Sequence, residues 1–388
     1  MTYTSIPERV LKNNPQIQAA LWTIKVAESR MTQSGRLRNP NLVTSFTSNA
    51  QTPERSTGVG IQQSFPITAR LRLEKNVSAL KIEEARTEVN MVARNVIEST
   101  LTTTVRWYGN RQRKSIIEDQ IRLANDLAEF LSTQSTKGEI SSLEAMHASL
   151  EAEELTLTMR PLELERKQLE SELRILLGLH PGVPIQLKGT LPTAQLSSAK
   201  NILMESRPDY RLLQSQIDTT LESIKLARAN RISDISLQLI HQWNREEDMP
   251  IGIEKERSAG IQLSIPLPLW NRNQGRIAEL NIKLKGLEST LLALELSISN
   301  HADAAFTGMV EHLANYLQIK DQSLPKRIQY QQALESSYRA GLSSFEMMLR
   351  ARDQILKLRL TQSDALTSFH IHRVKYQSET GNLPIFHE

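Results

Sequence analysis

The sequence predicts a mostly α-helical protein with a small β part, in which one architecture occurs twice. Three observations predict it: long stretches with apolar residues every three or four positions, short segments that alternate between apolar and polar residues, and a repeated octapeptide. The octapeptide reads GIQQSFPI from Gly60 and GIQLSIPL from Gly260, which lie 260 − 60 = 200 residues apart. A long polar stretch follows each copy, so we expect a duplication that includes both strands and helices.

The longest helical pattern covers residues 69–138, where no proline interrupts a stripe of apolar residues. At about 1.5 Å per residue this helix is roughly 100 Å long, and it must therefore pack against others of similar length. A second helix is predicted over 143–177, with a kink at Pro161 because proline lacks the N–H that continues a helix.

The second half of the chain repeats this plan. A helix is predicted over 275–340, broken at Pro325, and another over 343–378. The segment NNPQIQAAL (13–21) corresponds to SRPDYRLLQ (206–214), and each opens a helix that leads to a pair of strands. The chain therefore contains helix, strand pair, long helix, turn and helix, twice in the same order.

The two turns between long helices share a short pattern. Each has a glycine followed, after one or two residues, by two serines: Gly138 with 141–142, and Gly341 with 343–344. The glycine suits the left-handed position that ends a helix, and a serine can cap the next helix. We therefore predict two helical hairpin tips.

The strand-like segments alternate with period two, which indicates one apolar and one polar face. Charged, turn-rich stretches at 50–57 and 244–258 are predicted as exposed loops between them. Segments of roughly 8–11 residues suit tilted membrane-spanning strands, but surface hairpins packed on helices explain the alternation equally well. The segments are 41–49, 58–67, 233–243 and 260–269.

Four strands are too few to close a membrane-spanning barrel, which needs about eight or more. An open sheet edge is not viable in lipid. If the strands lie in a membrane, several copies of the chain must share one barrel, and the helices would form a tube with the same cyclic symmetry.

Composition and motifs exclude several classes. The 47 basic and 43 acidic residues form no dense basic block, so nucleic acid is not a predicted partner. The chain has no cysteine, no P-loop, no dinucleotide fingerprint and no nucleophile elbow. The histidines at 370–372 and the pair Glu311–His312 are interpreted as solvated. We therefore predict no catalytic, cofactor-binding or metal-binding residue, and no enzyme activity.

Several segments, taken together and in order, resemble the TolC-type outer-membrane efflux factor family. Within it, PLWNRNQGRI (268–277) resembles the heavy-metal (CzcC/CusC-like) branch that serves pumps of the resistance–nodulation–division (RND) class. The segments that carry the resemblance are RNPNL (38–42), GVGIQQSFPI (58–67), LRILLGLHPGVP (173–184), AGIQLSIPLPLWNRNQGRIAEL (259–280) and LPKRIQYQQALESSYRAGLSSFEMMLRARDQ (324–354).

The resemblance implies a homotrimer in the bacterial outer membrane that exports solutes, with heavy-metal cations as one class of cargo. It implies a periplasmic adaptor protein and an inner-membrane RND-type pump as partners, besides outer-membrane lipid. The start of the chain lacks a leader pattern, and we expect Met1 to follow a removed export signal. The implied regions are a tunnel (7–38, 68–231, 270–380, with a crossover at 178–207), a barrel (39–67, 232–269) and a tail (381–388).

The resemblance also places adaptor docking at the two tips, which gives a set of candidate contact residues. They are Lys137, Gly138, Glu139, Ser141, Ser142, Leu143, Arg339, Gly341, Leu342, Ser343, Ser344 and Phe345.

For the strands, the alternation predicts a lipid-facing set and an opposite, lumen-facing set. The lipid-facing residues are Ile61, Phe65, Leu237, Leu239, Ile261, Leu263 and Ile265; the lumen-facing residues are Gln62, Ser64, Gln238, Gln262 and Ser264.

A soluble, elongated coiled-coil scaffold or adaptor is the alternative function. The duplicated strand pairs favour the duct, because a scaffold has no use for exposed apolar strands.

Overall fold

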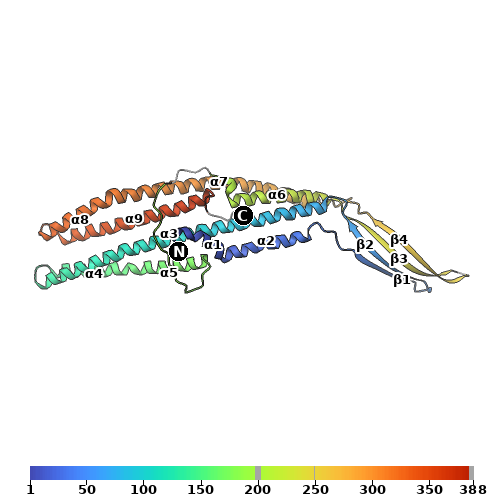
Figure 1. Ribbon diagram of the computed structural model, residues 1–388, viewed down its shortest axis with the longest axis horizontal. Helices are drawn as coiled ribbons and strands as arrows, with labels where there is room; N and C mark the ends of the chain where they lie inside the picture. Colours follow the sequence, from blue (N-terminus) through green and yellow to red (C-terminus); the bar gives the residue numbers. More distant parts are fainter. Residues whose placement is uncertain (197–201, 249, 384–388) are drawn as a thin grey trace. The chain divides into compact units, whose positions relative to one another are not determined.

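The computed structural model describes residues 1–196, 202–248 and 250–383, and it consists of helices and one four-stranded antiparallel sheet (Figure 1). The chain divides into two compact units. The first comprises Met1–Ala20, Val89–Pro208 and Leu294–Glu388; the second comprises Leu21–Glu88 and Asp209–Ala293. Residues 197–201 of the expected crossover and 384–388 of the expected tail lie outside the described residues.

Each half of the chain has the same order of elements, as the repeated segments predict. The first half contains η1 (Tyr3–Ser5), α1 (Ile6–Asn13), α2 (Pro15–Gln33), β1 (Asn41–Ser48), β2 (Arg55–Phe65), α3 (Arg70–Thr136), α4 (Ser142–Leu157) and α5 (Met159–Leu176). The second half contains η2 (Met204–Ser206), α6 (Pro208–Ala229), β3 (Ile235–Asp248), β4 (Gly252–Ser264), α7 (Gln274–Gln318), the π-helical turn η3 (Ile319–Ser323), α8 (Leu324–Arg339) and α9 (Phe345–Glu379).

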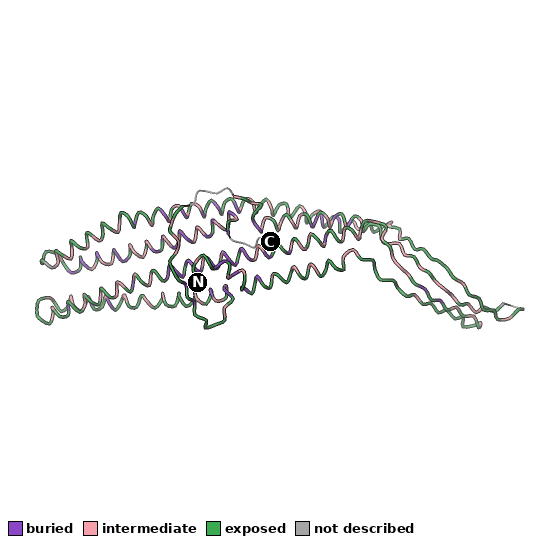
Figure 2. Tube along the Cα trace, in the orientation of Figure 1, coloured by how far each residue is buried: buried purple, intermediate pink, exposed green. Residues whose placement is uncertain are grey.

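The longest predicted helix is confirmed, because α3 runs unbroken for 67 residues. In the first unit it contributes Ile97 and Val105 to the main hydrophobic core, where they join Ile6 from α1 and Leu173 from α5. These side chains are nearly inaccessible to solvent, and Figure 2 shows buried residues along this part of α3. Burial of one helix stripe against neighbouring helices stabilises a helix far longer than its own propensity would support.

Both predicted helix breaks occur upstream of the prolines. The second helix of the first half is interrupted at Thr158 and not at Pro161, which lies in the first turn of α5. In the second half the π-helical turn η3 precedes Pro325, which occupies the first turn of α8. A proline cannot donate to the carbonyl four residues earlier, and its ring clashes with that carbonyl. The irregularity therefore falls before the proline, which then suits the start of a new helix.

The sheet has the strand order β1-β2-β3-β4, so the hairpins of the two halves pair through β2 and β3. Among the described residues, β1 and β4 each pair on one side only. The predicted strand at 260–269 ends early, because β4 stops at Ser264 and leaves Ile265 just outside the ladder. Pro266 follows, and a proline lacks the N–H that a ladder position requires.

The prediction of loops over 50–57 and 244–258 is wrong in its extent. Strand β2 begins at Arg55, and β3 and β4 extend as far as Asp248 and Gly252, so these strands are 14 and 13 residues long. On β4 the charges alternate in sign from Glu254 to Arg257, which fits a pleated strand, whereas β3 ends in three consecutive carboxylates after Arg245. Composition indicated a loop throughout, and only the alternation at 254–257 was a signal for a strand.

In each half, the residue before a helix-starting proline hydrogen-bonds to the end of the last helix of that half. We call this contact the closure of the half, and both closures lie in the first unit. Asn14 precedes the proline that starts α2, and its Nδ2 donates to the Leu176 carbonyl at the end of α5, 2.8 Å away. Arg207 precedes the proline that starts α6, and its Nη1 donates to the Glu379 carbonyl at the end of α9, 2.5 Å away. Both donors are almost fully buried, and each satisfies a helix-end carbonyl that lacks an intrahelical partner.

Glycines allow this closure. Gly178 and Gly381 follow α5 and α9 with φ of 65° and 73°. A Cβ at Gly178 would collide with the backbone carbonyl of Asn13, and a Cβ at Gly381 would collide with the Ser206 hydroxyl. Glycine is therefore required both by the left-handed backbone and by the close approach of the chain.

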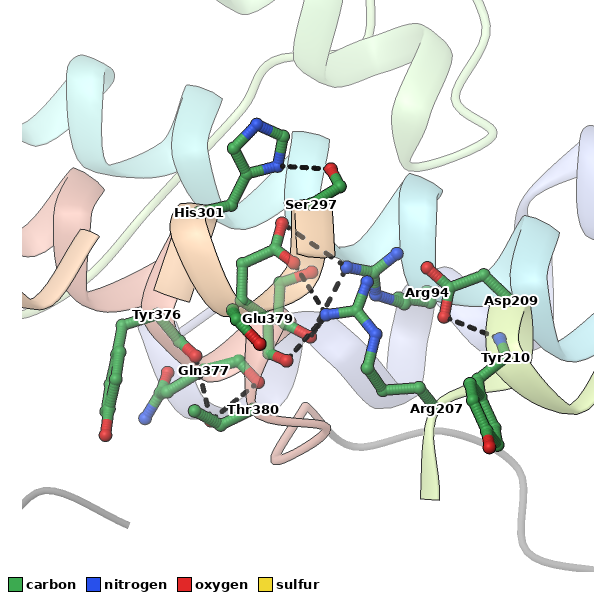
Figure 3. Close-up of polar contacts among 12 residues, drawn as sticks. Arg94, Arg207, Asp209, Tyr210, Ser297, His301, Tyr376, Gln377, Glu379 and Thr380 are labelled. Atoms are coloured by element: carbon green, nitrogen blue, oxygen red, sulfur yellow. Dashed lines mark hydrogen bonds and ion pairs between the residues drawn. The ribbon is translucent and has the colours of Figure 1, made fainter. Parts of the chain in front are cut away.

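The second closure carries charge, as Figure 3 shows. The Arg207 guanidinium lies 2.6 Å from the Glu379 carboxylate, and Arg94 of α3 approaches the same carboxylate at 3.7 Å. Arg94 also donates to the Ser378 carbonyl at 3.3 Å, and the Ser378 hydroxyl donates to Glu98 at 2.5 Å. This network joins α3, the end of α9 and the segment before α6.

The interpretation of the histidines at 370–372 as solvated is wrong for His370. Its side chain is fully buried on α9 beside Phe369, and neither ring nitrogen has a hydrogen-bond partner. Burial, assisted by the nearby charge of Arg373, lowers the pKa of His370 to about 4. His372 is half-buried and stacks with His312, at 5.1 Å between ring centroids.

Candidate functional site

One face of the sheet carries rows of uncharged polar side chains. Strand pairing places Gln62, Gln238 and Gln262 directly opposite one another, with Asn41 at the β1 end of the row. The adjacent polar row, two residues along, is Ser64, Ser236 and Ser264, and the first two hydroxyls are 3.0 Å apart. The sheet thus brings all five residues predicted to face a lumen onto one face.

The opposite face carries an apolar band. Leu42, Ile61, Leu239 and Ile261 form one row across all four strands, and they are exposed, with Ile261 at 74 %. Leu237 and Leu263 pair in the next row of this face, and Phe65 lies in the row beyond it. Strand pairing therefore groups the predicted lipid-facing residues within the ladder on one exposed face; Ile265 lies just outside it.

Polar residues interrupt this face, among them Thr44 in the row of Val59. Gln63 is opposite Leu237, and His241 is opposite Val59 and Ala259. Trp243 follows two residues later, and its ring meets that of His241 edge to face at 4.5 Å. An aromatic residue at the end of an apolar band is typical of a membrane–water boundary.

The tips are formed by glycine-terminated helices, as predicted. Gly138 and Gly341 have φ of 77° and 71°. At the first tip the N–H groups of Gly138 and Glu139 donate to the carbonyls of Ser135 and Gln134, each at 3.0 Å. Gly341 and Leu342 make the equivalent bonds at the second tip, both 2.9 Å. Both tips are thus closed by the Schellman pattern, which satisfies carbonyls at the end of a helix.

The serines cap the following helices, but at different positions. Ser141 accepts from the Leu143 N–H at 3.2 Å, whereas Ser344 accepts from the Met347 N–H at 3.4 Å. Ser343 instead donates to the Leu334 carbonyl of α8. The serine pair therefore provides one cap per tip, and the second serine in each pair is not equivalent.

A small core lies beneath the tips. It contains Leu131, Ala148, Phe345 and Met348, so it includes residues from α3, α4 and α9. Phe345 is only 5 % exposed and therefore belongs to this core, unlike the other predicted contact residues. Its aromatic neighbours include Tyr338, whose ring centroid lies 6.0 Å from that of Phe345.

Tyr338 connects the two tips. Its hydroxyl donates to Glu144 at 3.2 Å, so α8 of the second half is bonded to α4 of the first half. Burial, together with the repulsive charge and the hydrogen bond of Glu144, raises the pKa of the Tyr338 hydroxyl. The hydroxyl therefore stays protonated and remains a donor.

Most of the remaining predicted contact residues are accessible. Leu143 and Leu342 are 75 % and 82 % exposed. Ser343 is half-buried, and the side chain of Arg339 lies outside the described residues. Met146 and Met347 are also exposed beside the tips and were not among the predicted contacts; apolar residues on the outer side of the first helical turn are the signal that could have found them.

Two kinds of site are not found in the described part of the chain. No group of three or more acidic or histidine side chains could hold a metal ion. None of the described helices combines the length and the apolar character needed to cross a membrane.

Comparison with known proteins identifies the class to which this fold corresponds. Residues 201–381 match the family described as outer membrane efflux protein. The outer-membrane channel OprN has a similar structure, with a TM-score of 0.79 at 15 % sequence identity over 98 % of this chain and 90 % of that chain. Sequence comparison with curated proteins finds no match.

Two further solved structures are similar. CusC gives a TM-score of 0.73 at 18 % identity, covering 97 % of this chain and 91 % of that chain. VceC from Vibrio cholerae gives 0.78 at 13 % identity, covering 98 % and 96 %. The chain therefore has the fold of TolC-like outer-membrane channels, and its second half carries the sequence pattern of outer membrane efflux proteins.

Proposed function

We propose that the chain is one subunit of a trimeric outer-membrane duct that exports solutes. The observation that carries this proposal is the sheet, which has one exposed apolar face, one face with rows of glutamine and serine, and two edges without a described partner strand. An open edge is excluded from lipid because its backbone groups would be unsatisfied. Edges β1 and β4 of neighbouring copies would satisfy each other.

The number of copies follows from closure and from resemblance. Two copies give eight strands and three give twelve, and both numbers can close a barrel. The resemblance to TolC-type factors favours three copies. The match of residues 201–381 to outer membrane efflux proteins supports the same assembly, with the helices in the periplasm.

In this assembly the apolar band faces lipid and the polar rows face the lumen. The lipid-facing residues are Ile61, Phe65, Leu237, Leu239, Ile261 and Leu263, with Ile265 just beyond the ladder. Rings of glutamine and serine would then line the pore. Such rings are hydrated and carry no charge, so they suit passive passage of varied solutes.

We place the docking surface for a periplasmic adaptor at the tips. Leu143 and Leu342 support this choice, because they are exposed apolar side chains that a partner helix would cover. The adaptor would connect the duct to an inner-membrane RND-type pump. Phe345 would not contact the adaptor; it would hold the tips in place by packing in the small core below them.

For the cargo we propose heavy-metal cations, on the resemblance of residues 268–277 to the metal-exporting branch. A soluble coiled-coil scaffold is the second candidate, and the exposed apolar band of the sheet counts against it.

The function is tested in a host from which the chain has been removed. Wild-type chain should restore export and resistance to the transported metal, and Leu342→Asp should not, although it should still assemble. Leu342→Met keeps the apolar contact and is the matched control. Restored export by Leu342→Asp would place docking elsewhere, and no export with the wild-type chain would reject the duct.

A further inference from the structure

A row of cations crosses three strands at the end of the apolar band. Strand pairing places Arg55 of β2 opposite Arg245 of β3, and Arg245 opposite Lys255 of β4. Side chains directly opposite in an antiparallel sheet have Cβ atoms about 4.5–5.5 Å apart. Arg257 lies two residues from Lys255 on the same strand and therefore on the same face.

The charges at these strand ends are sorted by face. On β4 the sequence Glu254–Lys255–Glu256–Arg257 alternates in sign, so both cations point to the face of Ile261 and both carboxylates point to the opposite face. Glu246 of β3 pairs with Glu254 and also lies on that opposite face. At these strand ends, the face with the apolar band is therefore basic, and the face with the polar rows is acidic.

The cations lack partners of their own. No ion pair within the described part of the chain includes Arg55, Arg245, Lys255 or Arg257, and the Nε of Arg245 is buried without a hydrogen-bond partner. Glu54 is the nearest carboxylate in sequence to Arg55, but it accepts hydrogen bonds from Asn49 and Thr52.

Glu247 is the one described carboxylate of β3 on the same face as the cations. It lies one row beyond them, opposite Ile253. Like charges directly opposite in a sheet are destabilising. An anion that bridges the row would remove this repulsion.

The position of the row along the strands indicates the kind of anion. The next row toward the apolar band contains Phe46, Thr57, Trp243 and Arg257. Beyond it lie the Val59 row and then the fully apolar row of Ile61. The order apolar, aromatic, basic is the order hydrocarbon, interface, headgroup of a bilayer.

We propose that Arg55, Arg245, Lys255 and Arg257 form a binding surface for the phosphate groups of anionic lipids at the end of the membrane-spanning sheet that is remote from the helices. The proposal rests on the proposed function, because it requires the apolar band to lie in lipid. Guanidinium groups bind phosphate through two parallel hydrogen bonds, and the ammonium adds a point charge. A lipid is the favoured source because its acyl chains cover the apolar rows while its phosphate meets the cations.

The test uses the full chain in detergent, mixed with either phosphatidylglycerol or phosphatidylcholine, and measures lipid phosphorus retained per chain after gel filtration. Wild type should retain the anionic lipid in preference. Arg245→Gln/Lys255→Gln should lower this preference by roughly tenfold, since each cation near a headgroup contributes several-fold. Glu254→Gln/Glu256→Gln, at the same depth on the opposite face, is the matched control and should keep the preference. If the double variant fails to fold, the single change Lys255→Gln on the edge strand replaces it, and it should lower the preference for the anionic lipid by a smaller factor.

The outcomes separate the proposals. If wild type and the cation variant each retained both lipids equally, the proposed phosphate-binding surface would be rejected. The proposed duct function would be unaffected. Loss of the preference on adding millimolar inorganic phosphate at constant ionic strength would also overturn that surface, because a free-phosphate site would then be present. A chain that retains neither lipid and stays dispersed without detergent would reject the duct itself.

Discussion

The two halves of the chain use one backbone arrangement and two kinds of chemistry. Asn14 closes the first half with a neutral amide, and Arg207 closes the second half with a guanidinium that also pairs with Glu379. Both precede a helix-starting proline, and both lie against a left-handed glycine region. The duplication therefore maintains the places where helix ends need donors, and it leaves the identity of the donor free.

The final helices of the two halves also differ in burial. Helix α5 has two buried residues in 18, whereas α9 has 13 in 35. With Gly178 and Gly381 as equivalent positions, 381 − 178 = 203, the buried His370 corresponds to the exposed Lys167. The final helix of the second half is therefore the more buried of the two, and we expect the contact at its end to contribute more to stability.

The largest effect should follow from breaking the charged closure. Arg207→Met leaves Glu379 largely buried without its main partner, and we expect a loss of about 3–5 kcal/mol in the free energy of unfolding. Denaturant unfolding in detergent measures this loss. Arg207→Met/Glu379→Leu should recover part of it; a loss below about 1 kcal/mol in the single variant would show that the pair is not important.

The pH dependence of stability should test the burial of His370 on α9. Because the pKa of His370 is lowered to about 4 from 6.5, the unfolded chain binds a proton that the native chain does not over this range. Stability should therefore decrease as the pH falls from 6.5 to 4, by up to about 3 kcal/mol. His370→Gln should flatten this dependence in melting curves recorded at several pH values. An unchanged slope would mean that His370 becomes protonated in the native protein.

The neutral closure should matter less. Asn14→Ala removes the bond to the Leu176 carbonyl and the cap of α2, in which Asn14 Oδ1 accepts from the Gln16 N–H at 2.8 Å. We expect a loss of about 2 kcal/mol, measured by the same unfolding experiment. A loss equal to that of Arg207→Met would remove the contrast between the halves.

The smallest effect on stability should occur at the tips. A Cβ at Gly341 would meet nothing within 4 Å, so Gly341→Val costs only the strain of a left-handed residue, about 1 kcal/mol. Export and adaptor cross-linking should nevertheless fall. Gly341→Asn, which tolerates this backbone, is the control and should retain both. Wild-type cross-linking by the valine variant would exclude a docking role for this turn.

Much of the fold was accessible from sequence because the patterns are periodic. The 67-residue helix, the strand pairs and both glycine tips follow from spacing alone. The charged strand ends did not, because their composition is that of a loop and only the end of β4 has charges that alternate in sign. Burial of His370 and the pairing of Arg207 with Glu379 depend on contacts between segments far apart in the chain, which no local pattern contains.

The mass of the protein in detergent tests the central claim most directly. A sheet whose β1 and β4 edges have no partner strand among the described residues, and which has an apolar face, should be complete only when copies of the chain join edge to edge. Light scattering corrected for detergent should therefore give three chains of 44.0 kDa, 3 × 44.0 = 132 kDa. A mass of 44.0 kDa, with the strand signal in circular dichroism intact, would contradict the shared barrel and the duct built on it.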